Sequence, residues 1–279
     1  MDKRHLDHNA ERTRSNACSE PAARPERARS HACGESATRP EPAARAERTK
    51  HDEPAARTER ARHDEPAART ELIFILDASG SMSGLEDDTV GGFNAMLAEH
   101  RDGPGEAIVS TLIFNDHTRV LHDRVDVRSV EPLTRSEYRC SGCTALLDAV
   151  GGAIDHVDLV QRVQPAGYEA DKVLFVITTD GMENASSRYS YREVKRLIER
   201  QREKGWEFIF IGANIDVARE AERLGIDRDC AVGYVHDEVG TNVMYRAASC
   251  AARMVRCSEP LEAGAWRREL DEDVRRRGR

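Results

Sequence analysis

From residue 71 onward, apolar residues gather in short continuous runs that each end in a polar or glycine-containing turn. The clearest run covers residues 72–76 and has the sequence Leu-Ile-Phe-Ile-Leu. Similar runs cover residues 107–114, 173–178 and 208–211, and a weaker one covers residues 230–235. A continuous apolar run of this length is typical of a strand buried on both faces of a sheet. The polar segment that holds His117 and His122 predicts a turn or an edge strand.

Between these runs, apolar residues recur three or four positions apart, which is the spacing of an amphipathic helix. Ser190 and Glu193 form a capping box at the start of one such helix, Asn214 is a candidate cap for the next, and Gly225 is a stop signal for its end. A last helix is expected over residues 238–255. The marker positions of the first three helices are Val90, Phe93, Met96 and Leu97, then Leu146, Val150, Ile154 and Val157, then Tyr191, Val194, Leu197 and Ile198.

Alternating strands and helices predict an α/β fold, in which a doubly wound, mostly parallel six-stranded sheet carries helices on both faces. Ligands of such sheets bind at the carboxyl ends of the strands. The polar residues that follow each strand are therefore the ones to inspect for function.

Residues 1–70 differ sharply from the rest of the chain. They contain no Phe, Trp or Tyr and hold six of the ten prolines, and the pentapeptide Glu-Pro-Ala-Ala-Arg occurs four times, starting at residues 20, 41, 53 and 65. Such a segment cannot bury enough apolar surface to offset the entropy of ordering its backbone. We expect a disordered low-complexity repeat tail over 1–70, one folded domain over 71–256, and a charged, solvated C-terminal tail over 257–279, where four arginines follow residue 274.

Charge and cysteine content narrow the possible partners and compartment. The first 70 residues have a net charge of about +2 and the remainder −10, which argues against nucleic acid because phosphate binding needs clustered positive charge. The N-terminal residues lack the apolar segment of a signal peptide, and no run approaches the ~20 apolar residues that span a bilayer. An odd number of cysteines, seven, fits a reducing compartment. We therefore expect a cytoplasmic protein with no membrane partner.

Three polar segments follow strands or open a helix at the expected edge of the sheet. Asp77-Ala-Ser79-Gly-Ser81 follows the first strand, Asp180-Gly181 follows the third strong apolar run, and Ser141-Gly-Cys-Thr144 opens the second helix. Taken singly, the first is equally well explained as a loop with side-chain to backbone hydrogen bonds, the second as a turn, and Thr144 as a helix N-cap. Their combination and order favour a site instead.

Together these three segments resemble the metal-ion-dependent adhesion site of von Willebrand A domains, which have a Rossmann-like fold, and the resemblance covers residues 71–256. It implies that Ser79, Ser81 and Thr144 supply hydroxyl ligands while Asp77 and Asp180 act directly or through water. Hydroxyl and carboxylate oxygens suit Mg²⁺, with Mn²⁺ or Ca²⁺ as alternatives, and the absence of His and Cys from these positions disfavours Zn²⁺.

The resemblance implies a binding module, in which the metal accepts an Asp or Glu of a partner protein. In the family, intracellular bacterial members act as adaptor or assembly factors, sometimes beside AAA-type ATPases, and this chain has no P-loop of its own. Two alternatives stay open. The first is a Mg²⁺-dependent phosphohydrolase, although aspartyl-phosphate phosphatases need an Asp where Ser79 stands and no His lies in the three segments. The second is a purely structural metal. We expect that the protein is not an enzyme.

Cys140 and Cys143 form a C-x-x-C beside the predicted threonine ligand, where related domains commonly have Gly or Ser. Two loop thiols with no special role are the simpler interpretation, because no second pair of soft ligands is apparent. If the pair were oxidised, the Thr144 loop would be strained and the affinity for Mg²⁺ would change. That hypothesis predicts different Mg²⁺ affinities for the reduced and oxidised protein.

Overall fold

The computed structural model describes residues 68–261 and 264–278. The predicted tail therefore lies outside the described residues up to residue 67, and its last residues, Arg69 and Thr70, belong to the first strand instead. The folded domain starts two residues earlier than the sequence indicated, because Thr70 is buried in the sheet and the strand pairs from Arg69 onward.

Six strands form one sheet in the order β3-β2-β1-β4-β5-β6, which confirms the predicted fold class. All neighbouring pairs are parallel except β2 and β3, which are antiparallel. The strands are β1 (Arg69–Asp77), β2 (Glu106–Phe114), β3 (Thr118–Asp126), β4 (Lys172–Thr179), β5 (Glu207–Gly212) and β6 (Ala231–Gly233). The strand order reverses beside β1, so β1 and β4 leave the sheet next to each other at its carboxyl edge.

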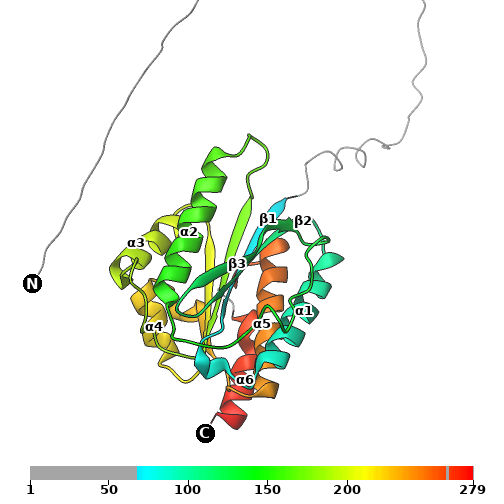
Figure 1. The fold of residues 1–279 in the computed structure, drawn as a ribbon. Helices are drawn as coiled ribbons and strands as arrows, with labels where there is room; N and C mark the ends of the chain where they lie inside the picture. Colours follow the sequence, from blue (N-terminus) through cyan, green and yellow to red (C-terminus); the bar gives the residue numbers. More distant parts are fainter. Residues whose placement is uncertain (1–67, 262–263, 279) are drawn as a thin grey trace, which may run out of the picture. The chain divides into compact units, whose positions relative to one another are not determined.

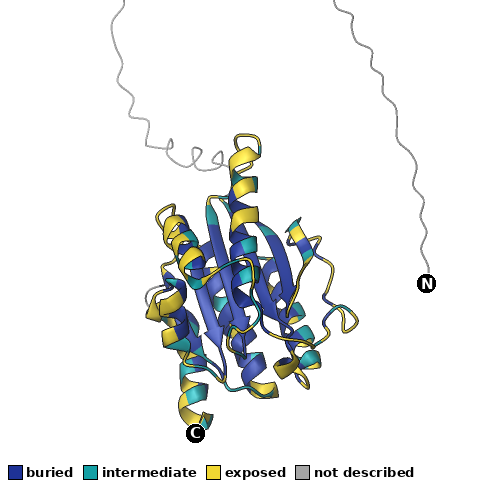
Figure 2. Ribbon diagram, turned by 60° about the vertical axis from the view of Figure 1, so that its left-hand side comes forward, coloured by how far each residue is buried: buried dark blue, intermediate teal, exposed yellow. Residues whose placement is uncertain are grey.

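Helices cover both faces of this sheet (Figure 1). One face carries α1 (Glu86–Arg101), α5 (Glu238–Arg256) and α6 (Arg268–Arg277), and the other carries α2 (Leu146–Val163), α3 (Tyr191–Arg202) and α4 (Val217–Leu224). Strand β1 shows why its run is continuously apolar: Leu72, Phe74 and Leu76 pack into one core, while Ile73 and Ile75 pack into the other. The strands are accordingly the buried layer in Figure 2.

The polar segment between the second and third runs forms β3 at one edge of the sheet. Val120 is half exposed there, whereas His122 points inward and its Nδ1 lies 3.0 Å from Thr111 Oγ1. An edge strand has neighbours on one side only, which explains why its sequence lacks the apolar character of the other strands.

Local signals at helix ends were predicted with mixed success. Ser190 and Glu193 form the expected capping box of α3, and Gly225 ends α4 in the left-handed conformation with φ +81°. The cap predicted at Asn214 is wrong. Asp216 caps α4 by accepting from the Arg219 N–H, while Asn214 adopts a positive φ of 58° in the preceding turn.

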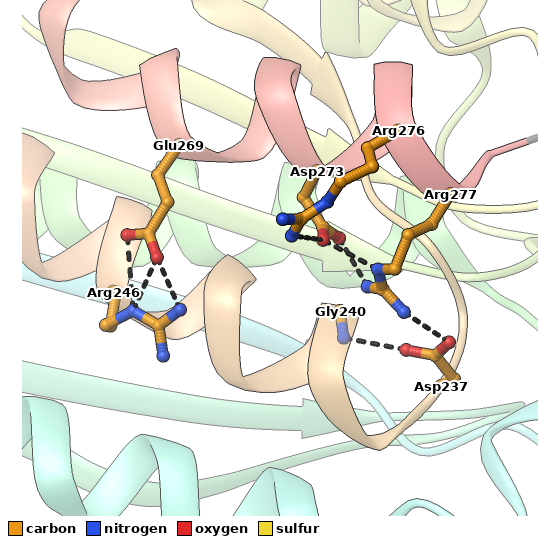
Figure 3. Close-up of polar contacts among 7 residues, drawn as sticks. All are labelled: Asp237, Gly240, Arg246, Glu269, Asp273, Arg276 and Arg277. Atoms are coloured by element: carbon orange, nitrogen blue, oxygen red, sulfur yellow. Dashed lines mark hydrogen bonds and ion pairs between the residues drawn. The ribbon is translucent and has the colours of Figure 1, made fainter.

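The solvated C-terminal tail predicted over 257–279 is also wrong for the part that the structure describes. A short 3₁₀ turn, Ala265–Arg267, leads into α6, and Trp266 and Leu270 are buried against α5. Figure 3 shows the polar side of this contact, where Arg246 binds Glu269 and Arg277 binds both Asp237 and Asp273. Arg277 and Glu269 are therefore held in ion pairs and do not belong to a solvated tail. In the described part of the chain, no helix combines the length and apolar character needed to cross a membrane.

Candidate metal centre

The first site segment leaves β1 with its carboxylate already buried and hydrogen-bonded. Asp77 Oδ1 accepts from the Ser79 N–H at 2.7 Å, and Oδ2 accepts from Thr179 Oγ1 at 2.6 Å. Burial raises the pKa of Asp77, hydrogen bonds from Thr179 and Ser79 oppose the rise, and the nearby Asp180 charge adds to it. A cation at this position would lower the pKa of Asp77, because positive charge favours the ionised carboxylate.

The two serines link this segment to the end of β4. Ser79 Oγ lies 3.1 Å from Ser81 Oγ, and Ser81 Oγ donates to Asp180 Oδ1 at 2.6 Å. Ser81 is part of a 3₁₀ turn, Gly80–Met82, that folds the chain back over the strand end. The two hydroxyls and both carboxylates are therefore brought to one place at the carboxyl edge of the sheet.

Thr144 reaches the same place through a loop that is fixed at several points. Its backbone exchanges two hydrogen bonds with Asn184: the Thr144 N–H donates to Asn184 Oδ1 at 2.9 Å, and the Asn184 N–H donates to the Thr144 carbonyl at 3.0 Å. A Cβ placed on Gly181 would lie 3.2 Å from Thr144 Oγ1 and 3.6 Å from Ser81 Oγ. The third predicted hydroxyl thus lies beside the other site residues. Thr144 is not the helix cap, since α2 begins after Ala145.

Backbone contacts tie the first and third loops together. The Gly80 N–H donates to the Gly142 carbonyl at 3.1 Å, and the Ser141 N–H donates to the Ala78 carbonyl at 2.9 Å. Asp148, in the first turn of α2, accepts from the backbone N–H groups of residues 187–189 and so anchors the loop after β4. The structure therefore brings all five predicted site residues together, and metal binding by them stays a prediction.

One buried oxygen has no hydrogen bond. Asp180 Oδ2 is buried and accepts no hydrogen bond; it lies 2.9 Å from His236 Nε2, close enough for an ion pair but outside hydrogen-bond geometry. Leaving a buried carboxylate oxygen unsatisfied is costly unless a cation or water completes its shell. Two carboxylates and three hydroxyls also form a hard oxygen set. On both counts the residues fit a divalent cation of the Mg²⁺ type, with Mn²⁺ and Ca²⁺ as alternatives.

Tyr138, His236 and Thr179, which donates to Asp77 Oδ2, were missed by sequence reasoning. Tyr138 is fully buried and its hydroxyl donates to the Asp77 carbonyl oxygen. His236 follows β6 and contacts Asp180. The signal for His236 was its position just after a strand, at the edge where ligands gather, but β6 is only three residues long and its end was hard to place.

The C-x-x-C thiols lie on the loop that leads to Thr144. Both are free; Cys143 is exposed, and Cys140 is half-buried, with burial raising its pKa to about 12. A thiol with so high a pKa is a poor nucleophile. An exchange reaction at this pair would therefore start at Cys143, and the redox hypothesis itself stays a prediction.

Comparison with known proteins gave matches in structure only. No protein-family model and no curated protein matches the sequence. Among solved structures, the pilus adhesin SpaC from Lactobacillus rhamnosus GG has a TM-score of 0.51 at 9% identity, over 68% of this chain and 30% of that one. A von Willebrand factor type A protein from Catenulispora acidiphila has a TM-score of 0.45 at 16% identity, over 67% of this chain and 43% of that one.

The domain has a von Willebrand A-like fold. A third similar structure is proximal thread matrix protein 1 from the mussel byssus with a zinc-occupied MIDAS motif, at 16% identity and a TM-score of 0.45. It is covered over 46% of its length, so this chain spans less than half of the mussel and Catenulispora proteins. At such low identity, the von Willebrand A-like likeness concerns the fold, and the chemistry must be argued from this chain's own residues.

Proposed function

We propose that the domain is a metal-dependent protein-binding module, in which Asp77, Ser79, Ser81, Thr144 and Asp180 hold a Mg²⁺-type ion that recruits a carboxylate of a partner protein. The observation that carries the proposal is the convergence of three hydroxyls and two carboxylates at one point, where Asp180 Oδ2 is buried, accepts no hydrogen bond and has the His236 ring 2.9 Å away. Mn²⁺ and Ca²⁺ are the alternative ions.

The charge balance of this site supports recruitment of an acidic group. Only two carboxylates face a doubly charged ion, and the remaining protein ligands are neutral hydroxyls. The ion therefore stays electrophilic, and an Asp or Glu of a partner completes its coordination better than a neutral group would. A partner without an accessible carboxylate is not expected to bind through the metal.

The wider role follows from this chemistry. A module of this kind suits an adaptor or assembly factor, and a separate AAA-type ATPase is one partner of that class. The five described cysteines, Cys140, Cys143, Cys230, Cys250 and Cys257, are all unpaired, which supports a reducing compartment such as the cytoplasm. Neither nucleic acid nor a membrane is part of the proposal.

The test is a pull-down from the source cell in Mg²⁺ and in chelator, with wild type and Thr144→Ala. The matched control is Ser129→Ala, which removes an exposed hydroxyl far from the site loops, after β3. Wild type and Ser129→Ala should retain the same partners in Mg²⁺ and lose them in chelator, and Thr144→Ala should lose them in both. Partners that persist in chelator would contradict metal-bridged recognition. Calorimetric titration with Mg²⁺, Mn²⁺, Ca²⁺ and Zn²⁺ would establish the ion.

A Mg²⁺-dependent phosphohydrolase is the second candidate, and one observation favours it. His236 lies 2.9 Å from Asp180, so a histidine is present at the site although none lies in the three sequence segments. We still infer that the protein is not an enzyme, because Ser79 stands where an aspartyl-phosphate phosphatase needs its second Asp. Mg²⁺-dependent hydrolysis of p-nitrophenyl phosphate that is lost in Asp77→Ala and His236→Ala would reverse this choice.

A further inference from the structure

A pocket of about 370 Å³ opens directly beside the candidate metal centre. Its floor includes Ala78, the residue between the predicted ligands Asp77 and Ser79. Its walls come from the turn between β2 and β3 and from the loop after β3, and they include His117, Arg119 and Arg139. We call it the Arg119–Arg139 pocket.

The walls of the pocket are connected to the loop that carries Thr144. Asn115 Nδ2 donates to Ser141 Oγ at 3.3 Å, and the Asn115 carbonyl accepts from the Ala145 N–H at 2.7 Å. The pocket and the metal centre therefore share two of their loops. A chain segment bound to the metal on this side would have to pass over the pocket.

The pocket is basic because neither of its two arginines forms a hydrogen bond or ion pair with a carboxylate among the described residues; the charge of Arg119 acts on Glu137 only at longer range. Arg119 donates to the Glu137 carbonyl oxygen, and Arg139 Nε donates to the Ser136 carbonyl oxygen at 3.0 Å. Both side chains belong to exposed residues, and neither makes an ion pair within the described part of the chain. Each guanidinium group thus keeps donors free for an incoming anion.

The one carboxylate that lines the pocket is already engaged. Glu137 Oε2 accepts from the Thr134 N–H at 2.9 Å and from Thr134 Oγ1 at 2.6 Å, and these bonds lower its pKa. Its carboxylate also interacts with the Arg119 charge, so it weakens the positive potential of the arginines without forming an ion pair with them. The rest of the folded region is strongly acidic, with a net charge of −10 for residues 71–279.

We propose that the Arg119–Arg139 pocket binds a second carboxylate of the partner segment whose first carboxylate binds the metal. The inference rests on the proposed function and gives it a specificity rule: the preferred ligand is an acidic peptide segment with two Asp or Glu residues a few positions apart. A protein segment is favoured over a nucleic acid because the acidic domain repels a long polyanion. Arg119 and Arg139 act as specificity-determining residues and leave the metal ligands unchanged.

The test uses synthetic Gly/Ser peptides that contain either a single Asp or an Asp followed by a Glu two, three, four or five positions later. These separations span roughly 7 to 17 Å in extended chain. Binding to the ¹⁵N-labelled protein in Mg²⁺ is followed by NMR titration. We expect one separation to bind about three- to tenfold more tightly than the single-Asp peptide, the gain of exposed ion pairs. The signals of Asn115, His117 and Arg119 should shift only with two-acid peptides.

Arg119→Gln combined with Arg139→Gln should remove this gain and leave single-Asp binding unchanged. The control combines Arg196→Gln with Arg219→Gln, two exposed arginines of α3 and α4, and should keep the gain. Single-Asp binding without a gain at any separation would overturn the inference alone. Failure of the single-Asp peptide to bind in Mg²⁺ would overturn the proposed function as well. A single-stranded oligonucleotide that competes with the two-acid peptide, and does so only when Arg119 and Arg139 are present, would show that the pocket binds phosphate. That result would also overturn the inference.

Discussion

Ser81 Oγ donates to Asp180 Oδ1 at 2.6 Å, and this single contact joins two loops that lie 99 residues apart in the chain. A hydroxyl has one proton and two lone pairs, so Ser81 can donate to Asp180 and still offer a lone pair to a cation. The protein thus aligns a hydroxyl ligand and a carboxylate ligand before any metal binds, which lowers the cost of ordering the site.

Asp180→Asn should abolish the stabilisation by metal without weakening the apoprotein. At pH 8 the variant removes the charge that faces Asp77 and keeps an acceptor for Ser81, so its melting temperature in chelator should equal or exceed that of wild type. Mg²⁺ at one hundred times its Kd should stabilise wild type by about 2.7 kcal/mol and the variant by nearly nothing. Thermal melts with and without Mg²⁺ measure this. The control is Asp229→Asn, an exposed residue that should respond like wild type.

Asp77→Ala separates a recruiting metal from a purely structural one. In a structural site, the variant would lower the melting temperature as strongly as it lowers partner binding, because the metal would hold three loops together. We expect partner binding to be lost, while the stability in chelator falls only by the effect of losing the hydrogen bonds from Ser79 and Thr179. Parallel melting curves and pull-downs on the same samples measure the two effects. A loss of cooperative melting would contradict the recruiting role.

Gly142→Ala should weaken metal binding through the Thr144 loop. Gly142 has φ +73°, and its carbonyl accepts from the Gly80 N–H at 3.1 Å, so a backbone shift there would move the loops of both Ser81 and Thr144. The backbone strain should cost about 1 to 2 kcal/mol, and the displaced loop should weaken Mg²⁺ binding about tenfold or more. Gly84→Ala is the control, because φ is +97° but no atom lies within 4 Å of the added Cβ. It should lose similar stability and keep its Mg²⁺ affinity, as urea titration and calorimetry would show.

Trp266→Ala should destabilise the domain by about 3 to 5 kcal/mol, the usual effect of removing a fully buried Trp side chain. Trp266 is 1% exposed and belongs to the same core as Leu270. Arg275→Ala, at an exposed position of α6, should change stability by less than about 0.5 kcal/mol. Urea unfolding measures both. If both substitutions changed stability by the same small amount, the C-terminal residues would be a solvated tail, as the charge pattern suggested.

Acid should destabilise the domain in part through His100. Burial, with the nearby Arg256 charge, lowers the pKa of His100 to about 4. The unfolded chain therefore binds an extra proton between pH 6.5 and 4, and this residue's contribution of about 3 kcal/mol is lost as pH falls through that window. The unfolding free energy of wild type should fall between pH 7 and pH 4. In His100→Gln this fall should be about 3 kcal/mol smaller. His117→Gln, an exposed control, should follow wild type.

The fold, and the meeting of Asp77 with Asp180, could be predicted from the sequence because both depend on strands. The apolar run from Leu72 to Leu76 must be buried on both faces, and parallel pairing of β1 with β4 then places Asp77 and Asp180 at one edge. Long-range partners were harder to predict. His236 contacts Asp180, but the only sequence signal for that contact was its position just after a weak apolar run, which forms a strand of three residues.

The errors at helix ends also have physical causes. Trp266, Leu270 and Val274 recur four residues apart, which is a helical signal, but the arginines around them dominated the pattern. Two of those arginines are paired: Arg267 with Asp271 one turn away, and Arg277 with Asp273 and also with Asp237, a long-range partner that only the folded chain reveals. Asn214 and Asp216 are both good capping residues, and the choice between them depended on the backbone of the turn.

Thr179 and Asp77, which share a hydrogen bond at the heart of the site, are 102 residues apart in the chain. An ion held by the proposed site could not bind until β1 and β4 have paired, so we expect metal capture late in folding, after the slow closure of a long loop. A ligand that binds only after the transition state slows unfolding and leaves the folding rate unchanged. In the cell, the bound metal would then slow unfolding, so that the domain would unfold most slowly while metal and partner are bound.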